Sequence, residues 1–395
     1  MRIKKFLKIF AVVTPILVLF LYISSVFINI PEVIFLRDGS NLKLNKGIIS
    51  YTLNKIYDNI SEYNVELLGF KIKTIEVMAI PKEIKLYPGG NVVGIKLQTN
   101  GPLVVGFSEI ENSEQKPYSP SKESGINLGD VILDVNGTEI NSSEFLAETL
   151  NSLKSDDEID IKVERDGKTM NKKVKPIKGN DGKNKIGLWV RDSTAGIGTV
   201  TFVDPETGLY GALGHPITDV DTGDIIKISK GNIVNSSIVN VKRGEKGNPG
   251  ELKGVFINDD TTLGNVMYNT KYGIFGEYSL ENFSGEKLSI GLKDEIQEGP
   301  AQIISTIDNG EPKMYDVVIE KLLQQDNPSS KSMIIKVTDE ELLEKTGGIV
   351  QGMSGSPIIQ NNKLVGAVTH VLVNKPDTGY GIYIEWMLKE SKMFD

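Results

Sequence analysis

The sequence predicts a mainly β protein of several units behind an apolar N-terminal helix, and three observations lead to this fold class. From residue 179 to the end, apolar runs of strand length recur between short stretches of Gly, Asp and Asn. The dipeptides Asn136-Gly137 and Asp166-Gly167 each separate two strand-like runs, as in β-hairpins. Residues 9–30 form an uncharged, largely apolar run. Together these patterns divide the chain into four segments, 1–31, 32–90, 91–178 and 179–395.

Composition excludes several classes of function. The formal net charge of −8 argues against a nucleic-acid partner, because binding a polyanion needs a basic surface. The chain has no cysteine, which excludes disulfides, thiolate catalysis and cysteine-bound zinc. It has only two histidines and no HExxH helix, so a three-histidine metal site cannot form. We therefore expect neither a metal nor another cofactor.

Segment 1–31 reads as a membrane anchor. Four basic residues precede the apolar run 9–30, which has about the length needed to cross a bilayer as a helix. The basic side should remain cytoplasmic, which places the rest of the chain on the other side of the membrane. The alternative is a cleaved signal peptide, but the run exceeds a typical apolar signal region and no clear A-x-A site follows it. We expect an uncleaved, single-pass signal anchor.

Segment 32–90 reads as a small β-containing linker domain without chemistry of its own. Apolar and polar residues alternate over short runs, as in residues 70–77. A helix is possible around residues 49–57. The turn Pro88-Gly89-Gly90 ends the segment.

Segment 91–178 has the order of a PDZ domain. Strand-like runs at 92–97 and 103–107 precede the turn Gly129-Asp130, and helical spacing predicts a helix over 143–153. Singly, these glycines and acids are ordinary turn residues, but the whole set resembles the PDZ family. That resemblance implies a peptide bound as an added strand beside a loop whose amides hold the terminal carboxylate. The loop would comprise Leu103, Val104, Val105, Gly106 and Phe107.

Segment 179–395 reads as almost wholly β. Many short strands over some 200 residues suggest a β-barrel or a pair of barrels. Two short helices are predicted near residues 339–345 and 385–390.

Ser354 is the candidate nucleophile of this segment. It lies in Gly352-Met353-Ser354-Gly355-Ser356-Pro357, where small neighbours suit an exposed serine on a tight turn. The backbone N–H groups of Gly352 and Ser354 are the natural donors to a developing oxyanion. An ordinary Gly/Ser turn between strands would look similar, so the assignment depends on a partner base.

The base must be one of the two histidines. His215 ends a short β run between Gly214 and Pro216, a position that suits proton transfer from a serine. His370 follows an alternating strand pattern, so a structural role is easily imagined for it. We therefore favour His215.

The acid is harder to assign. Asp339 opens a predicted helix, where a carboxylate stabilises the N-terminus without any catalytic role, and the residues alone favour that interpretation. Other carboxylates could orient the histidine instead. They are Asp219, Asp221, Asp224, Asp259 and Asp260.

Taken together, these motifs resemble the stage IV sporulation protein B peptidase family of endospore-forming bacteria. The most specific runs are residues 211–217 and 347–358, and residues 366–371 and 379–387 add to them. The resemblance implies a chymotrypsin-like serine endopeptidase with Ser354 as nucleophile, His215 as base and Asp339 as acid. Because Asp339 lies only fifteen residues before the serine, a Ser–His dyad remains open.

The resemblance also implies a role in sporulation signalling. Such an enzyme cleaves itself and cuts a membrane-bound regulator in the space between the two forespore membranes. That cut activates an intramembrane metalloprotease, which processes the late mother-cell sigma factor. The PDZ-like unit would hold the enzyme's own tail and substrate tails, and self-cleavage could release the catalytic part from the membrane.

Two other functions remain open. The chain could be an inactive, membrane-anchored PDZ scaffold. It could instead be a Ser–Lys tail-specific peptidase in which Lys345 or Lys363 is the base.

Overall fold

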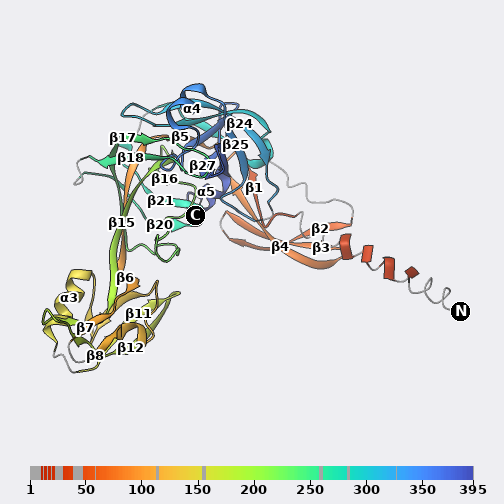
Figure 1. Ribbon diagram of the computed structural model, residues 1–395. Helices are drawn as coiled ribbons and strands as arrows, with labels where there is room; N and C mark the ends of the chain where they lie inside the picture. Colours follow the sequence, from red (N-terminus) through yellow and green to blue (C-terminus); the bar gives the residue numbers. More distant parts are fainter. Residues whose placement is uncertain are drawn as a thin grey trace.

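The computed structural model of the chain is shown in Figure 1. It describes residues 10–11, 13–15, 17–18, 20–22, 30–38, 48–57, 59–112, 115–153, 157–257, 261–282, 285–325 and 327–394. Over these residues, the buried apolar side chains form four clusters, one in each of four β-rich units. Within the described part of the chain, no helix is both long and apolar enough to cross a membrane. The predicted anchor at residues 9–30 lies partly outside that part.

The N-terminal unit is a four-stranded sheet with the order β1-β4-β3-β2. Its strands are β1 (Val33–Arg37), β2 (Ile49–Tyr57), β3 (Ile60–Leu67) and β4 (Phe70–Ile80). The possible helix at residues 49–57 is wrong, because this stretch pairs along its whole length with β3. β1 runs parallel to β4, with Val33 opposite Glu76. The sheet occupies residues 33–80 of the predicted segment 32–90, whose last part, β5 (Lys85–Pro88), pairs with strands of the C-terminal half. It extends away from the body of the molecule (Figure 1).

The first lobe of the C-terminal half is built around a core that includes Val93, Ile95, Val200, Tyr210 and Ile233. Its complete strands are β16 (Leu209–Ala212), β17 (Lys230–Lys242), β18 (Glu251–Phe256), β19 (Thr262–Asn265), β20 (Tyr268–Thr270) and β21 (Gly273–Glu277). β5 (Lys85–Pro88) pairs with the end of β15 (Leu188–Val203), and the start of β6 (Val92–Phe107) pairs with β17.

The PDZ-like unit is inserted between the two long strands β6 and β15. They pair with each other from Val92 opposite Thr199 to Phe107 opposite Leu188, and their outer halves continue as a ribbon into this unit (Figure 1). The strand-like run at residues 92–97, predicted to open the PDZ-like segment, therefore lies in the first lobe, where Val93 and Ile95 are core residues. One pair of strands is thus shared by two hydrophobic cores.

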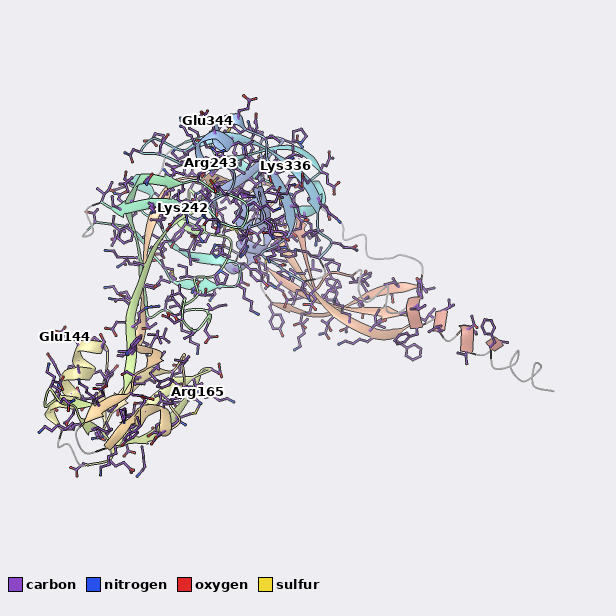
Figure 2. The ribbon with its side chains drawn as sticks, viewed as in Figure 1. Glu144, Arg165, Lys242, Arg243, Lys336 and Glu344 are labelled. Atoms are coloured by element: carbon purple, nitrogen blue, oxygen red, sulfur yellow. The ribbon has the colours of Figure 1, made fainter. Side chains whose placement is uncertain are left out.

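Within the PDZ-like unit, helix α3 (Ser143–Ser152) lies where the helical spacing predicts a helix. Its N-cap is Ser142, whose hydroxyl accepts from Phe145 N. The unit also contains the elements α2 (Pro120–Glu123), β7 (Ile110–Asn112), β8 (Gln115–Tyr118), β9 (Val131–Val135), β10 (Thr138–Glu139), β11 (Ile159–Arg165), β12 (Lys168–Val174), β13 (Ile177–Lys178) and β14 (Asn184–Lys185). The buried carboxylate of Asp130 accepts two hydrogen bonds from Arg165, which is labelled in Figure 2. This ion pair fixes the Gly129-Asp130 turn that the sequence singled out.

The predicted carboxylate-binding loop is not a loop. Residues 103–107 form the end of β6, and their backbone pairs with residues 188–191 of β15. Val104 also bonds to the turn before β9, through Val104 N to Asp130 O (2.8 Å) and Gly129 N to Val104 O (2.9 Å). A run of consecutive apolar residues here fills a strand, which leaves few amides for a ligand.

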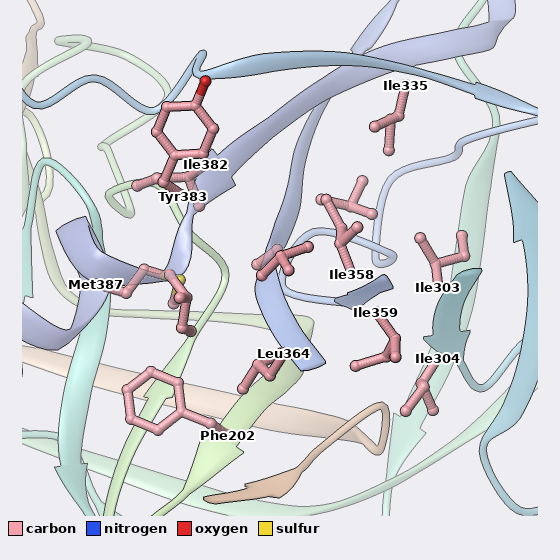
Figure 3. Close-up of a cluster of buried hydrophobic side chains, with 14 of the residues drawn as sticks. Phe202, Ile303, Ile304, Ile335, Ile358, Ile359, Leu364, Ile382, Tyr383 and Met387 are labelled. Atoms are coloured by element: carbon pink, nitrogen blue, oxygen red, sulfur yellow. The ribbon is translucent and has the colours of Figure 1, made fainter. Parts of the chain in front are cut away.

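The second lobe holds the largest core. Its strands are β22 (Leu288–Ile290), β23 (Gly299–Ser305), β24 (Lys313–Leu322), β25 (Met333–Val337), β26 (Pro357–Gln360), β27 (Lys363–Leu372) and β28 (Lys375–Tyr383). Its helices are α4 (Glu340–Thr346), α5 (Ile384–Glu390) and the 3-10 turns η1 (Leu280–Asn282) and η2 (Lys293–Glu295). Both predicted helices are confirmed. Figure 3 shows Phe202 of β15 beside Leu364 and Met387, so β15 also packs into the second lobe.

Candidate active site

His215 is carried to the boundary of the two lobes by a tight reversal. β16 ends at Ala212, and both Leu213 (φ 68°) and Gly214 (φ 69°) have left-handed backbone. A Cβ added at Gly214 would lie 2.8 Å from Thr369 Cγ2 on β27. Only glycine allows the chain to approach the second lobe this closely, and His215 follows directly.

The loop of Ser354 comes from the second lobe and is held by β15 of the first. Gly352 and Gly355 both have φ of 98°, which turns the chain sharply on each side of the serine. Thr199 donates its N–H to Ser354 O (3.0 Å) and its hydroxyl to Gly352 O (2.8 Å). Gly355 N donates to Val368 O (2.7 Å). The nucleophile loop is therefore fixed by backbone contacts on both sides.

Two backbone amides of this loop are available to a substrate. Met353 N donates to Val350 O, and its side chain is fully buried, which turns this middle residue inward. Within the described chain, neither Gly352 N nor Ser354 N donates a hydrogen bond. These are the two amides predicted to bind the oxyanion, and free donors beside a nucleophile are what that task requires.

A cleft of about 500 Å³ brings the candidate residues together. Ser354, His215 and His370 all line it. Apolar side chains from both lobes form much of its wall, namely Ile95, Ile197, Leu213, Ile349 and Val350. This combination of an apolar wall with a few convergent polar groups suits a peptide side chain next to a reactive centre.

The hydrogen bonds of the cleft define the state of its two key groups. His215 Nδ1 lies 2.8 Å from Pro216 O. Since a carbonyl only accepts, Nδ1 carries the proton and Nε2 is left as the base. The Ser354 hydroxyl donates to Thr369 O (2.8 Å). Its side chain must therefore rotate toward His215 before attack, in keeping with the loose geometry of many ligand-free sites.

Burial keeps both imidazoles neutral. It lowers the pKa of His215, and the contact with Pro216 O opposes this only in part. Burial, His215 and Lys331 together lower the pKa of His370 to about 4. The two ring centroids are 5.1 Å apart, and His370 Nδ1 is buried without a hydrogen-bond partner among the described residues. A neutral His215 is the form that can accept a proton.

The structure does not bring Asp339 into this cleft. Its carboxylate caps α4 by accepting from Leu342 N (2.9 Å), and it also accepts from Asp316 N (3.3 Å). It is absent from the residues that line the cleft. Both oxygens have structural partners, as expected for an acid at a helix N-terminus.

The rival acids belong to the segment after His215 or lie outside the described residues. Asp219 is buried, pairs with Arg191 (2.5 Å) and accepts from the amides of Asp221 and Thr222. Asp221 also pairs with Arg191 (2.7 Å). Asp224 lines a separate pocket beside the PDZ-like unit. Asp259 and Asp260 lie outside the described residues. Along the described chain, no carboxylate lines the cleft.

The two rival lysine bases are also elsewhere. Lys345 Nζ lies 2.7 Å from Glu341 Oε1, and this contact raises the pKa of the lysine. Lys363 Nζ lies 2.8 Å from Glu295 Oε1. Neither lysine lines the cleft. The raised pKa of Lys345 is also the opposite of what a catalytic base needs.

Two positioning residues gave no signal in the sequence. The Asn269 side chain bonds to Ile217 N (2.9 Å), Ile217 O (2.8 Å) and Ile226 O (2.9 Å), which closes the loop after His215. Arg191 ties the same loop to β15 through its ion pairs. Both contacts join residues far apart in the sequence, so neither local pattern nor motif could show them.

Comparison with known proteins finds matches to two families. Residues 182–388 match the family model of the SpoIVB peptidase S55, and residues 94–175 match that of the PDZ domain. A probable periplasmic serine endoprotease DegP-like from Marinomonas sp. is 28% identical over 151 residues. That match covers 35% of this chain and 30% of the relative, so the chain spans under a third of that protein.

Among solved structures, the active form of the Rv3671c protease from M. tuberculosis is 12% identical. The match covers 51% of this chain and 74% of the Rv3671c chain, with a TM-score of 0.32. The PDZ domain of an SdrC-like protein from Listeria monocytogenes is 20% identical to this chain. That match covers 23% of this chain and 87% of the Listeria chain, with a TM-score of 0.19.

Proposed function

The chain is a PDZ-containing serine peptidase of the SpoIVB peptidase S55 family, and we propose that a Ser354–His215 dyad cleaves its protein substrates. The observation that carries the proposal is the cleft between the lobes. There a serine, a neutral histidine and two unoccupied amides meet, with no carboxylate along the described lining.

In the proposed reaction, His215 Nε2 takes the Ser354 proton as Oγ attacks the substrate carbonyl carbon. The amides of Gly352 and Ser354 stabilise the oxyanion. Pro216 O, held 2.8 Å from Nδ1, keeps the ring in the correct tautomer and faces the imidazolium that forms. That carbonyl takes the place of the usual carboxylate. The imidazolium then protonates the leaving amine, and water releases the acyl group.

We further propose that the enzyme acts in sporulation signalling. It would cleave itself and a membrane-bound regulator in the space between the forespore membranes, which activates an intramembrane metalloprotease for the late mother-cell sigma factor. Family membership and the predicted anchor at residues 9–30 support this proposal. The PDZ-like unit, placed on a ribbon that ends at the nucleophile loop, would hold the tails to be cut.

The test compares full-length wild type with Ser354→Ala in the same membranes. Wild type should shorten with time, react with a fluorophosphonate and cut an added membrane-anchored regulator, and the variant should do none of these. Equal shortening of both proteins would contradict self-cleavage. Absence of labelling in a folded wild-type protein would favour the inactive scaffold.

Asp339 offers a direct test of dyad against triad. Asp339→Ala should lower stability by about 1 kcal/mol through loss of the helix cap, whereas Asp339→Ser should retain the cap. With a dyad, kcat/KM per folded molecule should change less than about threefold in both variants. If Asp339 is the triad acid, both variants should lose about 10⁴-fold, as loss of a triad acid does elsewhere. Thermal melts and peptide hydrolysis separate these cases.

The pH profile should report the buried His215. Because burial lowers the pKa of His215 from 6.5, the neutral base persists below that pH. The acid limb of kcat/KM should therefore have its midpoint below pH 6.5. An acid limb centred above 6.5 would show a carboxylate stabilising the imidazolium. The measurement is peptide hydrolysis from pH 4.5 to 8 at constant ionic strength.

A further inference from the structure

We propose that the hairpin tip of the N-terminal sheet inserts into the surface of the bilayer that holds the anchor. The tip comprises Ile48, Leu68, Gly69 and Phe70. This inference rests on the proposed membrane anchor at residues 9–30, and it assigns the sheet a second contact with the same membrane.

The tip presents three large apolar side chains to solvent. Phe70 is 77% exposed, Leu68 65% and Ile48 46%. They lie together, because Leu68 N donates to Ile48 O (3.0 Å) and Phe70 pairs across the hairpin with Leu67. Single exposed apolar residues are common on proteins, but a group of them at one protruding turn indicates a binding surface.

The turn itself carries an unusual residue. Leu68 and Gly69 have φ of 52° and 83°, nearly the same as Asn136-Gly137 (52° and 84°) and Asp166-Gly167 (50° and 75°). Asn and Asp tolerate this left-handed backbone, whereas leucine is disfavoured there. A Cβ added at Gly69 would meet no heavy atom of the described residues within 4 Å. Packing within the described chain therefore does not account for Leu68.

The described chain enters the sheet near the same end, at Ile30. β1 runs parallel to β4. Ile30 precedes β1, and its carbonyl oxygen accepts from Lys73 Nζ on β4 (2.9 Å). Ile30 therefore lies toward the end of β4 that begins with Phe70. From Lys73 to Gly69 is four residues, or about 13 Å of strand. The tip thus extends toward the membrane beyond the point where the anchor ends.

A lipid surface fits this tip better than a protein groove does. The polar layer of a bilayer is roughly 5–8 Å thick on each side of the hydrocarbon core, so a 13 Å projection passes through it. An aromatic ring next to an exposed lysine, here Phe70 and Lys71, is a common pairing at membrane interfaces. The anchor holds the sheet beside such a surface permanently.

The experiment uses the absence of cysteine in this chain. Phe70→Cys in the full-length protein is labelled with an environment-sensitive fluorophore and reconstituted into phosphatidylcholine–phosphatidylglycerol vesicles carrying nitroxide lipids. The matched control is Met314→Cys on β24, which is 54% exposed. Quenching at position 70 should exceed that at 314 at least threefold.

A second variant tests the role of the turn. Leu68→Asn copies the Asn136-Gly137 turn, so it should leave the melting temperature unchanged or higher while at least halving the quenching at position 70. Equal quenching at positions 70 and 314 in protein that floats with vesicles would contradict insertion of the tip and leave the proposed anchor intact. Protein that does not float with the vesicles would contradict both the membrane anchor and the insertion of the tip. A fluorescence change at position 70 that is independent of lipid would assign the tip to a protein partner and overturn the proposal.

Discussion

Replacing His215 with alanine is expected to lower kcat by at least about 10⁴-fold, because the change removes the proposed acceptor of the Ser354 proton. The fold should persist, since His215 lies on the cleft wall rather than in a core cluster. The measurement is single-turnover hydrolysis of a peptide ester, with circular dichroism to confirm folding. Substrate binding should change little, so the loss should fall on kcat rather than KM.

His370 provides the matched control in the same cleft. Its ring faces His215 at 5.1 Å, yet its pKa of about 4 and its buried, unpartnered Nδ1 give it no evident part in proton transfer. His370→Ala should therefore cost less than about tenfold in kcat. If His370→Ala abolishes turnover and His215→Ala does not, the base assignment is reversed.

Much of the site could be predicted because its signals are local. Ser354 and His215 stand in runs of small residues whose backbone geometry, with φ of 98° at Gly352 and 69° at Gly214, only glycine readily adopts. The scarcity of histidine reduced the choice of base to two positions, and both line the cleft. Local turn chemistry, residue scarcity and the family resemblance together led to Ser354 and His215 as the proposed reactive pair.

The acid and the peptide loop were harder because their roles depend on distant contacts. The sequence predicts that Asp339 opens a helix, but a helix cap could also face a histidine, and only the tertiary structure shows that its carboxylate accepts from Leu342 N and Asp316 N instead. The resemblance to PDZ domains assigns residues 103–107 to a loop, but residues 188–191 pair with them from more than 80 positions away. Short apolar runs do not reveal which strand lies beside them.

The insertion of the PDZ-like unit was hidden for a related reason. β6 and β15 are each continuous strands, so no turn or change of composition marks the point where one core ends and another begins. Thr199 near the end of β15 holds the nucleophile loop, while Asp192 on the same strand accepts from Ser143 at the start of α3. The same strand therefore contacts both α3 and the Ser354 loop.

Gly355→Ala is expected to have the largest effect on stability among the glycines of the site. A Cβ there would lie 2.0 Å from Thr199 O and 2.6 Å from Leu213 N, both backbone atoms that cannot rotate away. The φ of 98° adds strain for any other residue. Together, overpacking and the left-handed backbone should lower the free energy of unfolding by about 3–5 kcal/mol. Chemical denaturation measures the loss.

Gly137→Ala is the matched control, because its φ of 84° is similar but no heavy atom lies within 4 Å of the added Cβ. It should cost only about 1–2 kcal/mol, the price of the backbone conformation alone. The difference between the two variants isolates the contact of the nucleophile loop with β15. Any folded Gly355→Ala protein should also lose turnover, because relief of the clash moves Ser354 away from His215. Equal destabilisation with full activity would mean that Thr199 does not position the serine.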